Sequence, residues 1–563
     1  MQKIITRIGF FVVIFVLSFF IWYSPALLKG DVPYKINESL PLAKNIYQTG
    51  LYSLENSQNI FLSSSLIKQE GEISSLGNKF TAYFYAWVFK VVGLLSPQGL
   101  ILFAILLNAL TLVIFSLAVW RLFGLKVSVI FSALYVFMPF VWSSIYSLGN
   151  YEFGVLFVSL FFLFFVLGRD SRYSIFFYSM AGLWLALAAI VKEPFLLLIP
   201  IVIVYLWFRS SRKAVWACLV PIILVLAVFY LPNFFDKDSG NVYSLIFFSG
   251  GQRTFSDYNS YGHLYPDPYT YHFDRQNFLA EYNQGIKDSG FIGSLQLKKV
   301  LANLGEARLS IFERLSLGVV LLATHLSYFV SLKEVGGPLI LFLMMLGFLY
   351  LKGKDKRLSD FFILWVAATV FLLSFVVLVN RSHLRDFSWL LPLLGALGIC
   401  FLADALKEKI KLPAKAEPLF WLVLLGVFVY HLALMDRLNL GRLYEAPESP
   451  KIEAAASQLK KMNIPNEKII ALGFSSQGQL AINYLADKST IIFSPETINR
   501  LSREGKLAEA FKKFNVSYAM GFSDELSAVI ASSTPVQVIS VSSQEEESPR
   551  ASSLKIFLLN LAK

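Results

Sequence analysis

The chain has 563 residues and a net charge of +12; 56% of its residues are hydrophobic, only 16% are charged, and its mean hydropathy is +0.59. A soluble domain is roughly 45 to 50% apolar, so this composition excludes an ordinary soluble protein and requires lipid around most of the chain. In a membrane protein, an excess of Lys and Arg indicates loops that stay on the cytoplasmic side, and it gives no reason to expect a nucleic-acid partner.

Apolar runs predict an all-α polytopic membrane protein with about eleven transmembrane helices within residues 1–435. The first run, Ile8–Leu28, follows Lys3 and Arg7. It has about 20 residues, enough to cross a ~30 Å hydrocarbon core, and is longer than the apolar part of a cleaved signal peptide. The later runs lie near residues 100–120, 127–145, 153–167, 174–191, 194–208, 214–230, 336–351, 361–379, 387–403 and 418–434.

The loops between these runs predict the orientation. With the N-terminus in the cytoplasm, the inner segments and the first residues together hold 17 basic and 6 acidic residues. The first outer loop, up to Lys79, holds five Lys and five acidic residues. Because Lys and Arg concentrate in cytoplasmic loops, we expect the C-terminal domain outside the cytoplasmic (inner) membrane. The inner segments are 121–126, 169–172, 209–213, 352–360 and 404–417.

Two external loops, 29–98 and 234–335, are long and rich in aromatic residues. Within the first, Ser74–Gly93 reads as a helix that lies at the membrane interface. Within the second, Leu315–Val330 is apolar, but a span there would move later basic loops outside. We therefore expect an interfacial or re-entrant helix.

The composition becomes that of a soluble domain from about Lys451, and we predict a small extracytoplasmic α/β domain over residues 436–563. Strand-like runs alternate with helix-like runs, as in α/β proteins. The expected strands are 468–474, 490–494, 516–520, 536–540 and 554–559, and the expected helices are 477–486 and 496–514.

Ionisable residues gather at the predicted outer ends of the spans. A charge at bilayer depth costs several kcal/mol unless it is paired or hydrated, so such residues mark functional sites. The clusters contain Asp31, Tyr34 and Glu38 after the first span, Glu152 before the fourth, Lys192 and Glu193 at a tight turn, and Arg381, His383 and Arg385 before a late span.

The order of these motifs resembles GT-C glycosyltransferases such as protein O-mannosyltransferases and the lipid A aminoarabinose transferase. An acidic residue after the first span precedes Ala-x-x-Ile-x-x-x-Gly-x-Tyr-Ser, which begins at Ala43. Phe80–Gly93 resembles the interfacial helix of the family, Leu185–Pro200 its Lys-Pro turn, and Arg385–Leu394 its late span with Leu-Pro-Leu-Leu. The correspondence runs over roughly residues 1–435.

The resemblance implies a membrane enzyme that moves a sugar from a polyprenyl-phosphate donor to a lipid, glycan or protein acceptor at the outer face. A carboxylate takes the acceptor proton, and cationic groups or a metal stabilise the leaving phosphate. Asp31, Glu38 and Glu152 are the candidate catalytic residues. The candidates for binding substrate or phosphate are Lys192, Arg381, His383, Arg385 and Tyr34.

The base assignment stays divided between Asp31, Glu38, Glu152 and the absence of any catalytic carboxylate. Glu152 also suits the acidic partner of the base. In the family the acidic residue lies about two helical turns before the Ala. In this sequence that position falls near Lys35, with Asp31 before it and Glu38 after it. Each residue also has a structural interpretation. Asp31 and Glu152 suit helix starts, the arginines suit headgroup anchors, and Lys192 suits an ion pair with Glu193.

The cofactor question also stays open between no metal and a divalent metal. His263 and His272 stand near Asp267 and Asp274 in an aromatic loop, but they lack a metal-binding spacing.

Other classes of function remain as alternatives. A transporter or flippase of lipid-linked glycans would show inverted repeats and broken midplane helices, which the sequence does not indicate. A ligase or polymerase of lipid-linked glycans would share the donor. An oligosaccharyltransferase is disfavoured because the C-terminal domain contains no Trp-Trp-Asp-Tyr-Gly run.

Overall fold

The structure is a computed structural model, and its described residues form two compact units. The first unit comprises residues 1–32, 96–250 and 310–446, and the second comprises 33–95, 251–309 and 447–563. The structure describes residues 2–29, 34–37, 39–50, 61–62, 67–69, 72–73, 79–149, 152–169, 171–235, 275–303, 306–377, 381–410, 413, 416–445, 448–462, 464, 468–473, 476–493, 495–533, 536–541 and 554–559.

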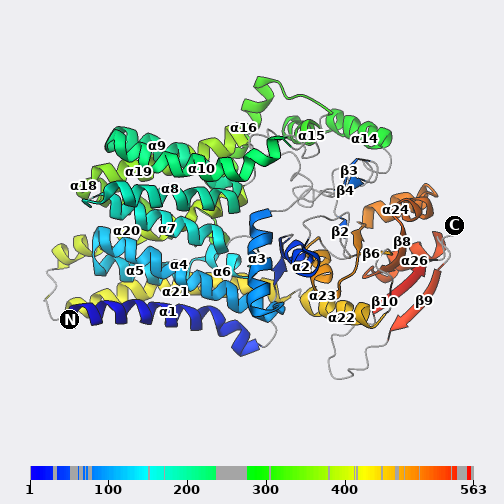
Figure 1. The fold of residues 1–563 in the computed structure, drawn as a ribbon, viewed down its shortest axis with the longest axis horizontal. Coiled ribbons are helices and arrows are strands. Elements are labelled where there is room, and N and C mark those ends of the chain that lie inside the picture. Colours follow the sequence, from blue (N-terminus) through cyan, green and yellow to red (C-terminus); the bar gives the residue numbers. More distant parts are fainter. Residues whose placement is uncertain are drawn as a thin grey trace. The chain divides into compact units, whose positions relative to one another are not determined.

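The first unit is a helical bundle in which most long helices run roughly parallel or antiparallel to one another (Figure 1). Its elements are α1 (Gln2–Lys29), α4 (Pro97–Phe123), α5 (Leu125–Val136), α6 (Pro139–Ile145), β5 (Ser147–Leu148), α7 (Glu152–Arg169), α8 (Ser174–Val191), the 3₁₀ helix η1 (Glu193–Leu197), α9 (Leu198–Arg209), α10 (Arg212–Phe235), α16 (Ile311–Tyr328), α17 (Leu332–Val335), α18 (Pro338–Lys354), α19 (Lys356–Phe371), the π-helix η2 (Leu372–Val377), the 3₁₀ helix η3 (Arg381–Leu390), α20 (Leu391–Ile410) and α21 (Glu417–Glu445).

Among the described residues, eight helices are long and apolar enough to cross a membrane, or nine if the bent pair α5 and α6 forms one span. The chain is therefore an integral membrane protein. The predicted spans near 194–208 and 336–351 correspond to α9, which is a short apolar helix, and to α18, which has 17 residues. Neither belongs to the eight, so the count of eleven stays a prediction.

The bend between α5 and α6 has a local cause. Pro139 begins α6, and the two helices differ in direction by 58°. The break frees the Val136 carbonyl, which accepts hydrogen bonds from the indole N–H groups of Trp22 at 3.0 Å and Trp142 at 2.9 Å. Within lipid a freed backbone group needs such partners, so the two tryptophans stabilise the bend.

Close helix packing at glycine joins α18 to α20. A Cβ at Gly347 would overlap the backbone carbonyl of Leu394, and a Cβ at Gly398 would overlap that of Leu343. Small residues at such contacts let membrane helices approach closely, where dispersion contacts hold them together.

The basic segments predicted to be cytoplasmic lie at one end of the bundle. Arg169 at the end of α7 pairs with Asp355 at 2.8 Å, and Arg209 at the end of α9 pairs with Asp360. The ring of Tyr350 lies 6.2 Å from that of Phe401, which brings the ends of α18 and α20 together. The remaining ion pairs of this end are Lys126 with Asp404 and Lys407 with Glu417, and the rings of Phe11 and Trp120 bring the start of α1 to the end of α4.

Helix α16 covers most of the segment predicted to be interfacial or re-entrant. Ser310 and Glu313 form a capping box that starts it. One face packs on the bundle through Gly318, which lies against the Phe375 ring. Phe312 and Val319 remain exposed, so the helix keeps an apolar face that suits lipid.

The second unit is an α/β domain built from three separate stretches of the chain. Its sheet has the order β2-β7-β6-β8-β10-β9; β2, β7, β6 and β8 are parallel, and β10 is antiparallel to both β8 and β9. The elements are β1 (Lys35–Ile36), α2 (Ser39–Thr49), β2 (Phe61–Leu62), β3 (Ile67–Gln69), β4 (Glu72–Ile73), α3 (Lys79–Val92), α14 (Arg275–Asp288), α15 (Phe291–Asn303), α22 (Glu448–Lys461), β6 (Ile469–Leu472), α23 (Ser476–Ala486), β7 (Thr490–Ile492), α24 (Pro495–Arg503), α25 (Leu507–Lys513), β8 (Val516–Met520), α26 (Asp524–Ser533), β9 (Val536–Val541) and β10 (Leu554–Leu559).

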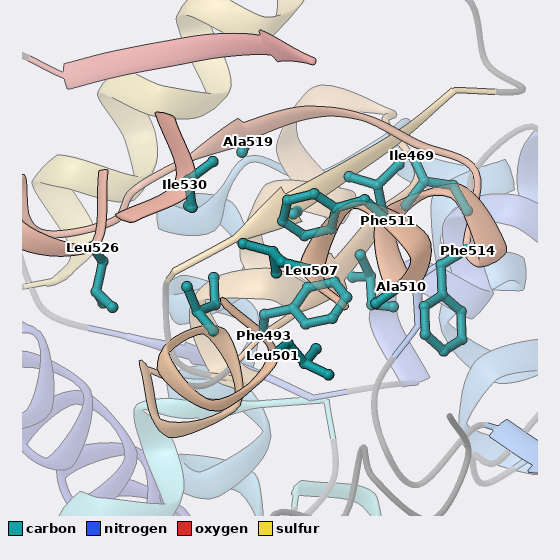
Figure 2. Packing of buried hydrophobic residues seen from close by; sticks show 14 residues of the cluster. Ile469, Phe493, Leu501, Leu507, Ala510, Phe511, Phe514, Ala519, Leu526 and Ile530 are labelled. Atoms are coloured by element: carbon teal, nitrogen blue, oxygen red, sulfur yellow. The ribbon is translucent and has the colours of Figure 1, made fainter. Parts of the chain in front are cut away.

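Apolar side chains from the sheet and from α24, α25 and α26 form the core of this domain (Figure 2). The rings of Phe493 and Phe511 meet edge to face at 5.2 Å. The expected single helix 496–514 is two helices. Gly505 lies between them with φ +68°, a conformation that glycine adopts at little cost.

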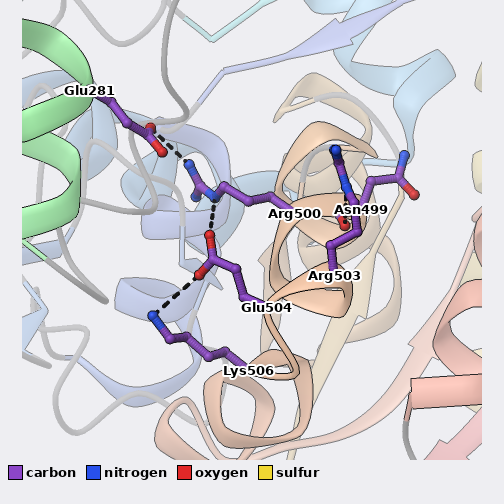
Figure 3. Close-up of polar contacts among 6 residues, drawn as sticks. All are labelled: Glu281, Asn499, Arg500, Arg503, Glu504 and Lys506. Atoms are coloured by element: carbon purple, nitrogen blue, oxygen red, sulfur yellow. Dashed lines mark hydrogen bonds and ion pairs between the residues drawn. The ribbon is translucent and has the colours of Figure 1, made fainter. Parts of the chain in front are cut away.

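The hairpin of α14 and α15 is tied to α24 by charges. Arg500 lies 3.1 Å from Glu281 of α14 and also faces Glu504, which Lys506 approaches at 3.2 Å (Figure 3). The segment 275–303 therefore contacts the C-terminal sequence, although 219 residues separate Glu281 from Arg500.

Candidate active site

The antiparallel helices α7 and α8 bring two candidate residues to one end of the bundle. Glu152 begins α7, and Lys192 directly follows α8. Arg169, at the other end of α7, forms an ion pair with Asp355 in the basic segment 352–360. A carboxylate and an ammonium group are thus placed at the end opposite the basic loops.

Glu152 is almost fully buried, with 2% of its surface exposed. It lies in the first turn of α7, and its Oε1 accepts a hydrogen bond from the backbone N–H of Gly149 at 3.4 Å. The partial positive charge at a helix N-terminus stabilises a carboxylate there. A buried carboxylate held in this way is suited to accept a proton and also to start the helix.

Lys192 is also buried, with 6% exposure. Its backbone is extended and its N–H donates to the Ala188 carbonyl, which ends α8. A Cβ at Gly154 would lie 3.4 Å from the Lys192 Cβ and 2.9 Å from the Phe195 ring. The missing side chain of Gly154 therefore lets the turn after α8 pack on the start of α7.

The segment with the candidate arginines lies next to this turn. Phe195 of η1 contacts Phe387 of η3 edge to face, with ring centroids 5.9 Å apart. Arg381, His383 and Arg385 belong to η3. Their backbone is described, and their side chains lie outside the described part. The fold thus places the η3 backbone beside the turn that begins at Lys192.

Sequence reasoning missed two hydrogen bonds of α16, one to η2 and one to η3. The imidazole Nδ1 of His325 lies 2.7 Å from the Ser374 hydroxyl in η2. The Tyr328 hydroxyl lies 2.8 Å from the Ser388 hydroxyl in η3. All four residues are buried. Sequence patterns do not reveal the contact of His325, because the π-helix that presents Ser374 has no sequence signature.

Sequence reasoning also missed a small pocket that is lined by residues of α4, α5, α6, α7 and η3. Its polar lining comes from Asn108, Tyr135 and Ser144, and Val155 of α7 closes one side. Trp389 of η3 lines it too and stacks on Phe115 at 4.8 Å. The remaining lining residues are Phe140 and Val141. A pocket of this size with polar lining suits one bound water.

The other candidates are not brought to this place by described residues. Asp31 and Glu38 lie outside the described residues, as do His263, His272, Asp267 and Asp274. Tyr34 belongs to the second unit, where its hydroxyl donates to the Glu453 carboxylate of α22 at 2.9 Å.

The described residues contain no group of three or more His, Cys, Asp or Glu that would hold a metal. Glu152 and Lys192 alone do not form a ligand set, since an ammonium group repels a cation.

Solved structures with the same arrangement of helices identify the fold. The archaeal oligosaccharyltransferase AglB from Archaeoglobus fulgidus, in complex with an inhibitory peptide and a dolichol-phosphate, is 14% identical, and the match covers 92% of this chain and 69% of that chain with a TM-score of 0.57. The same oligosaccharyltransferase tethered with an acceptor peptide is 14% identical, with coverages of 98% and 74% and a TM-score of 0.57. The chain has the GT-C fold.

The GT-C similarity includes both units, since it covers nearly the whole chain. ArnT from Cupriavidus metallidurans, bound to undecaprenyl phosphate, is 11% identical, with coverages of 99% and 98% and a TM-score of 0.46. No protein-family model and no curated protein sequence matches the chain. Within this fold, Glu152 begins α7 and Lys192 directly follows α8, so both lie at the same end of the helical bundle.

Proposed function

We propose that the chain is a glycosyltransferase that moves a sugar from a polyprenyl-phosphate-linked donor to an acceptor. The observation that carries the proposal is that buried Glu152 and buried Lys192 lie at the same end of a bundle with the GT-C fold, and that the backbone of η3 lies beside the turn after α8. Buried charges are costly in a membrane bundle, and they are retained where chemistry needs them.

The chemistry needs one proton acceptor and one cationic site. A carboxylate takes the proton from the acceptor hydroxyl or amine as that group attacks the anomeric carbon of the sugar. The bond between the sugar and the lipid phosphate breaks, and the phosphate leaves with the bonding electrons. Asp31 is our first candidate for the base, Glu38 the second, and Glu152 the acidic partner or the base.

Cationic side chains would hold the departing phosphate. Lys192 supplies an ammonium group at the turn after α8, and Arg381, His383 and Arg385 come from η3. Charge that develops on the phosphate in the transition state is stabilised by cations already in place. Tyr34 is our further candidate for contact with the donor, and its hydroxyl also anchors α22 through Glu453.

We further propose that the site faces the outside of the cytoplasmic (inner) membrane. The basic segments share one end of the bundle, which the positive-inside rule assigns to the cytoplasm. Glu152 lies at the other end. The N-terminus is then cytoplasmic and the α/β domain is periplasmic or extracellular.

The solved structures support the donor class more than the acceptor. One GT-C neighbour is a complex with a dolichol-phosphate and an inhibitory peptide, and another is tethered with an acceptor peptide containing the NVT sequon. These similarities favour oligosaccharide transfer to a peptide as a second candidate. The absence of Trp-Trp-Asp-Tyr-Gly after residue 435 disfavours it.

The test is a transfer assay with purified protein in proteoliposomes. Polyprenyl-phosphate sugars are offered with lipid, glycan or sequon-peptide acceptors, and wild type is compared with Asp31→Asn, Glu38→Gln and Glu152→Gln. Glu408→Gln is the matched control, because Glu408 is an exposed carboxylate in the basic segment 404–417. Loss of turnover in one carboxylate variant that still binds the donor identifies the base.

Two outcomes contradict the proposal. Full activity in all three carboxylate variants removes the carboxylate mechanism. Movement of lipid-linked glycan between the leaflets with no transfer of sugar would identify the protein as a flippase.

A further inference from the structure

The last turns of α1 contain a proline that changes the hydrogen bonds of the helix. Pro25 has no backbone N–H, so the Ile21 carbonyl loses its helical partner, and the Ser24 hydroxyl donates to it at 2.7 Å. The next carbonyl, that of Trp22, accepts a hydrogen bond from the Tyr146 hydroxyl at 2.8 Å. A residue 124 positions away in the sequence thus bonds to the backbone of α1 beside the proline.

Trp22 contacts the bent pair α5 and α6 at two places. Its side chain is fully buried. Its indole N–H donates to the carbonyl of Val136, the last residue of α5, at 3.0 Å, and its own carbonyl accepts from Tyr146, which directly follows α6. One residue of α1 therefore holds α6 near its start and at its end.

The end of α6 leads to the buried carboxylate of Glu152. Tyr146 lies three residues before Gly149, whose N–H donates to Glu152 Oε1 at 3.4 Å. Gly149 has φ +97°, a backbone conformation that residues with a side chain rarely adopt. Because Leu148 between them is buried, this short connection has little room to move. The direction of the Gly149 N–H, and with it the orientation of the carboxylate, depends on where α6 ends.

The polar groups of Trp22 and Tyr146 are not needed to fill space. Both residues are buried, and a phenylalanine at either position would supply aromatic packing without a polar group. A buried polar group is costly unless it is hydrogen-bonded. When it is bonded, it fixes a distance and a direction between two elements, which apolar packing does less strictly.

We propose that Trp22 and Tyr146 are positioning residues for sugar transfer: by fixing the end of α6, they keep the Gly149 N–H directed at the Glu152 carboxylate and hold that carboxylate in one orientation. The inference rests on the proposed function. It gives the break between α5 and α6 a part in the reaction, because the break brings the end of α6 to the start of α7.

The experiment compares wild type with Tyr146→Phe and Trp22→Phe, which remove one donor each and keep an aromatic ring. Gly149→Ala strains the backbone of the third donor and leaves the other two in place. Ser18→Ala is the matched control, because it removes a buried hydroxyl whose hydrogen bond stays within α1. We measure kcat, the KM for the donor, thermal unfolding, and amide hydrogen exchange of residues 147–149.

We expect Tyr146→Phe and Trp22→Phe each to lower kcat about fivefold, the effect of one buried hydrogen bond. The donor KM changes less than about twofold, because a displaced carboxylate slows chemistry more than binding. Amide exchange at Gly149 rises in both variants. Gly149→Ala lowers kcat about fivefold or more, and Ser18→Ala leaves kcat and this exchange at wild-type values.

The inference is overturned if Tyr146→Phe keeps both kcat and Gly149 exchange at wild-type values. A loss of kcat in Ser18→Ala as large as that in Tyr146→Phe also overturns it, since the effect then belongs to the stability of α1. If Trp22→Phe does not fold, Tyr146→Phe and Gly149→Ala decide.

The carboxylate variants separate this inference from the proposed function. If wild type transfers no sugar, the proposed function fails. If wild type is active and Glu152→Gln keeps full activity, only the positioning role is overturned, and the base is sought at Asp31 and Glu38.

Discussion

The Tyr328 hydroxyl in α16 lies 2.8 Å from the Ser388 hydroxyl in η3. Ser388 donates its own proton to the Leu384 carbonyl at 2.7 Å, so Tyr328 is the donor to Ser388. This bond connects α16 to the short helix η3, to which Arg381, His383 and Arg385 belong.

Tyr328→Phe removes this hydroxyl and leaves the ring. A buried hydrogen bond contributes about 1 kcal/mol, which corresponds to roughly a fivefold effect. Because η3 carries the predicted phosphate ligands, we expect the KM for the donor to rise about fivefold and kcat to change less. Tyr173→Phe, at an exposed position, is the control. Unchanged KM values would show that α16 does not position η3 for the donor.

Lys192→Gln removes the buried cation at the end of α8. Loss of one group that stabilises transition-state charge typically costs about 10²- to 10³-fold in kcat, and we expect a loss in that range. Lys213→Gln, an exposed lysine of the predicted cytoplasmic segment 209–213, should leave the rate unchanged. A wild-type rate for the Lys192 variant would reduce this residue to a structural role.

Gly347→Ala tests the contact between α18 and α20. The added Cβ would overlap the Leu394 carbonyl, a backbone group that cannot rotate away as a side chain can. We expect destabilisation of about 1 to 3 kcal/mol, measured as thermal unfolding in detergent. Gly353→Ala in the same helix meets nothing within 4 Å and serves as the matched control. Equal melting temperatures for the two variants would contradict the close packing.

Asp355 gives the stability a pH dependence. Burial raises the pKa of this carboxyl, but the Leu358 N–H and Arg169 outweigh it, and the pKa lies below its ordinary value. A lowered folded-state pKa stabilises the protein above the unfolded-state pKa, and this contribution is lost as pH falls through the folded-state value. Asn can still accept from the Leu358 N–H, and solvent screens the partly exposed ion pair with Arg169, so Asp355→Asn should cost about 0.2 to 1 kcal/mol at pH 7.

The difference between wild type and Asp355→Asn should vanish on acidification to pH values below the lowered pKa of Asp355. Thermal unfolding at a series of pH values measures it. A difference that stays constant from pH 7 into the acid range would assign the effect to packing.

Asp436 in α21 is buried, and neither carboxylate oxygen has a hydrogen-bond partner among the residues that the structure describes. An unpaired polar group costs about 1 to 3 kcal/mol in protein cores. We expect Asp436→Leu to raise the melting temperature. If transfer activity falls at the same time, Asp436 has a functional role, because functional sites often sacrifice stability. A lower melting temperature would point to a partner elsewhere in the chain.

Some of the candidate site followed from local pattern. Glu152 and Lys192 were recognisable because a charge beside an apolar run is unusual, and their common end follows from two spans joined by a short turn. The hydrogen bonds of His325 with Ser374 and of Tyr328 with Ser388 were not predictable. They depend on a π-helix and a 3₁₀ helix, which hydrophobic periodicity does not reveal.

The sequence by itself determined that the protein lies in a membrane and which loops share one end of the bundle. Both follow from the length of apolar runs and the positions of Lys and Arg, which are properties of the chain read residue by residue. Only the tertiary structure decided that residues 33–95 and 251–309 join the C-terminal domain and that the Lys44 ammonium group of α2 donates to the Tyr484 carbonyl near the end of α23. Contacts between residues hundreds of positions apart depend on the packing of whole elements, so no local pattern encodes them.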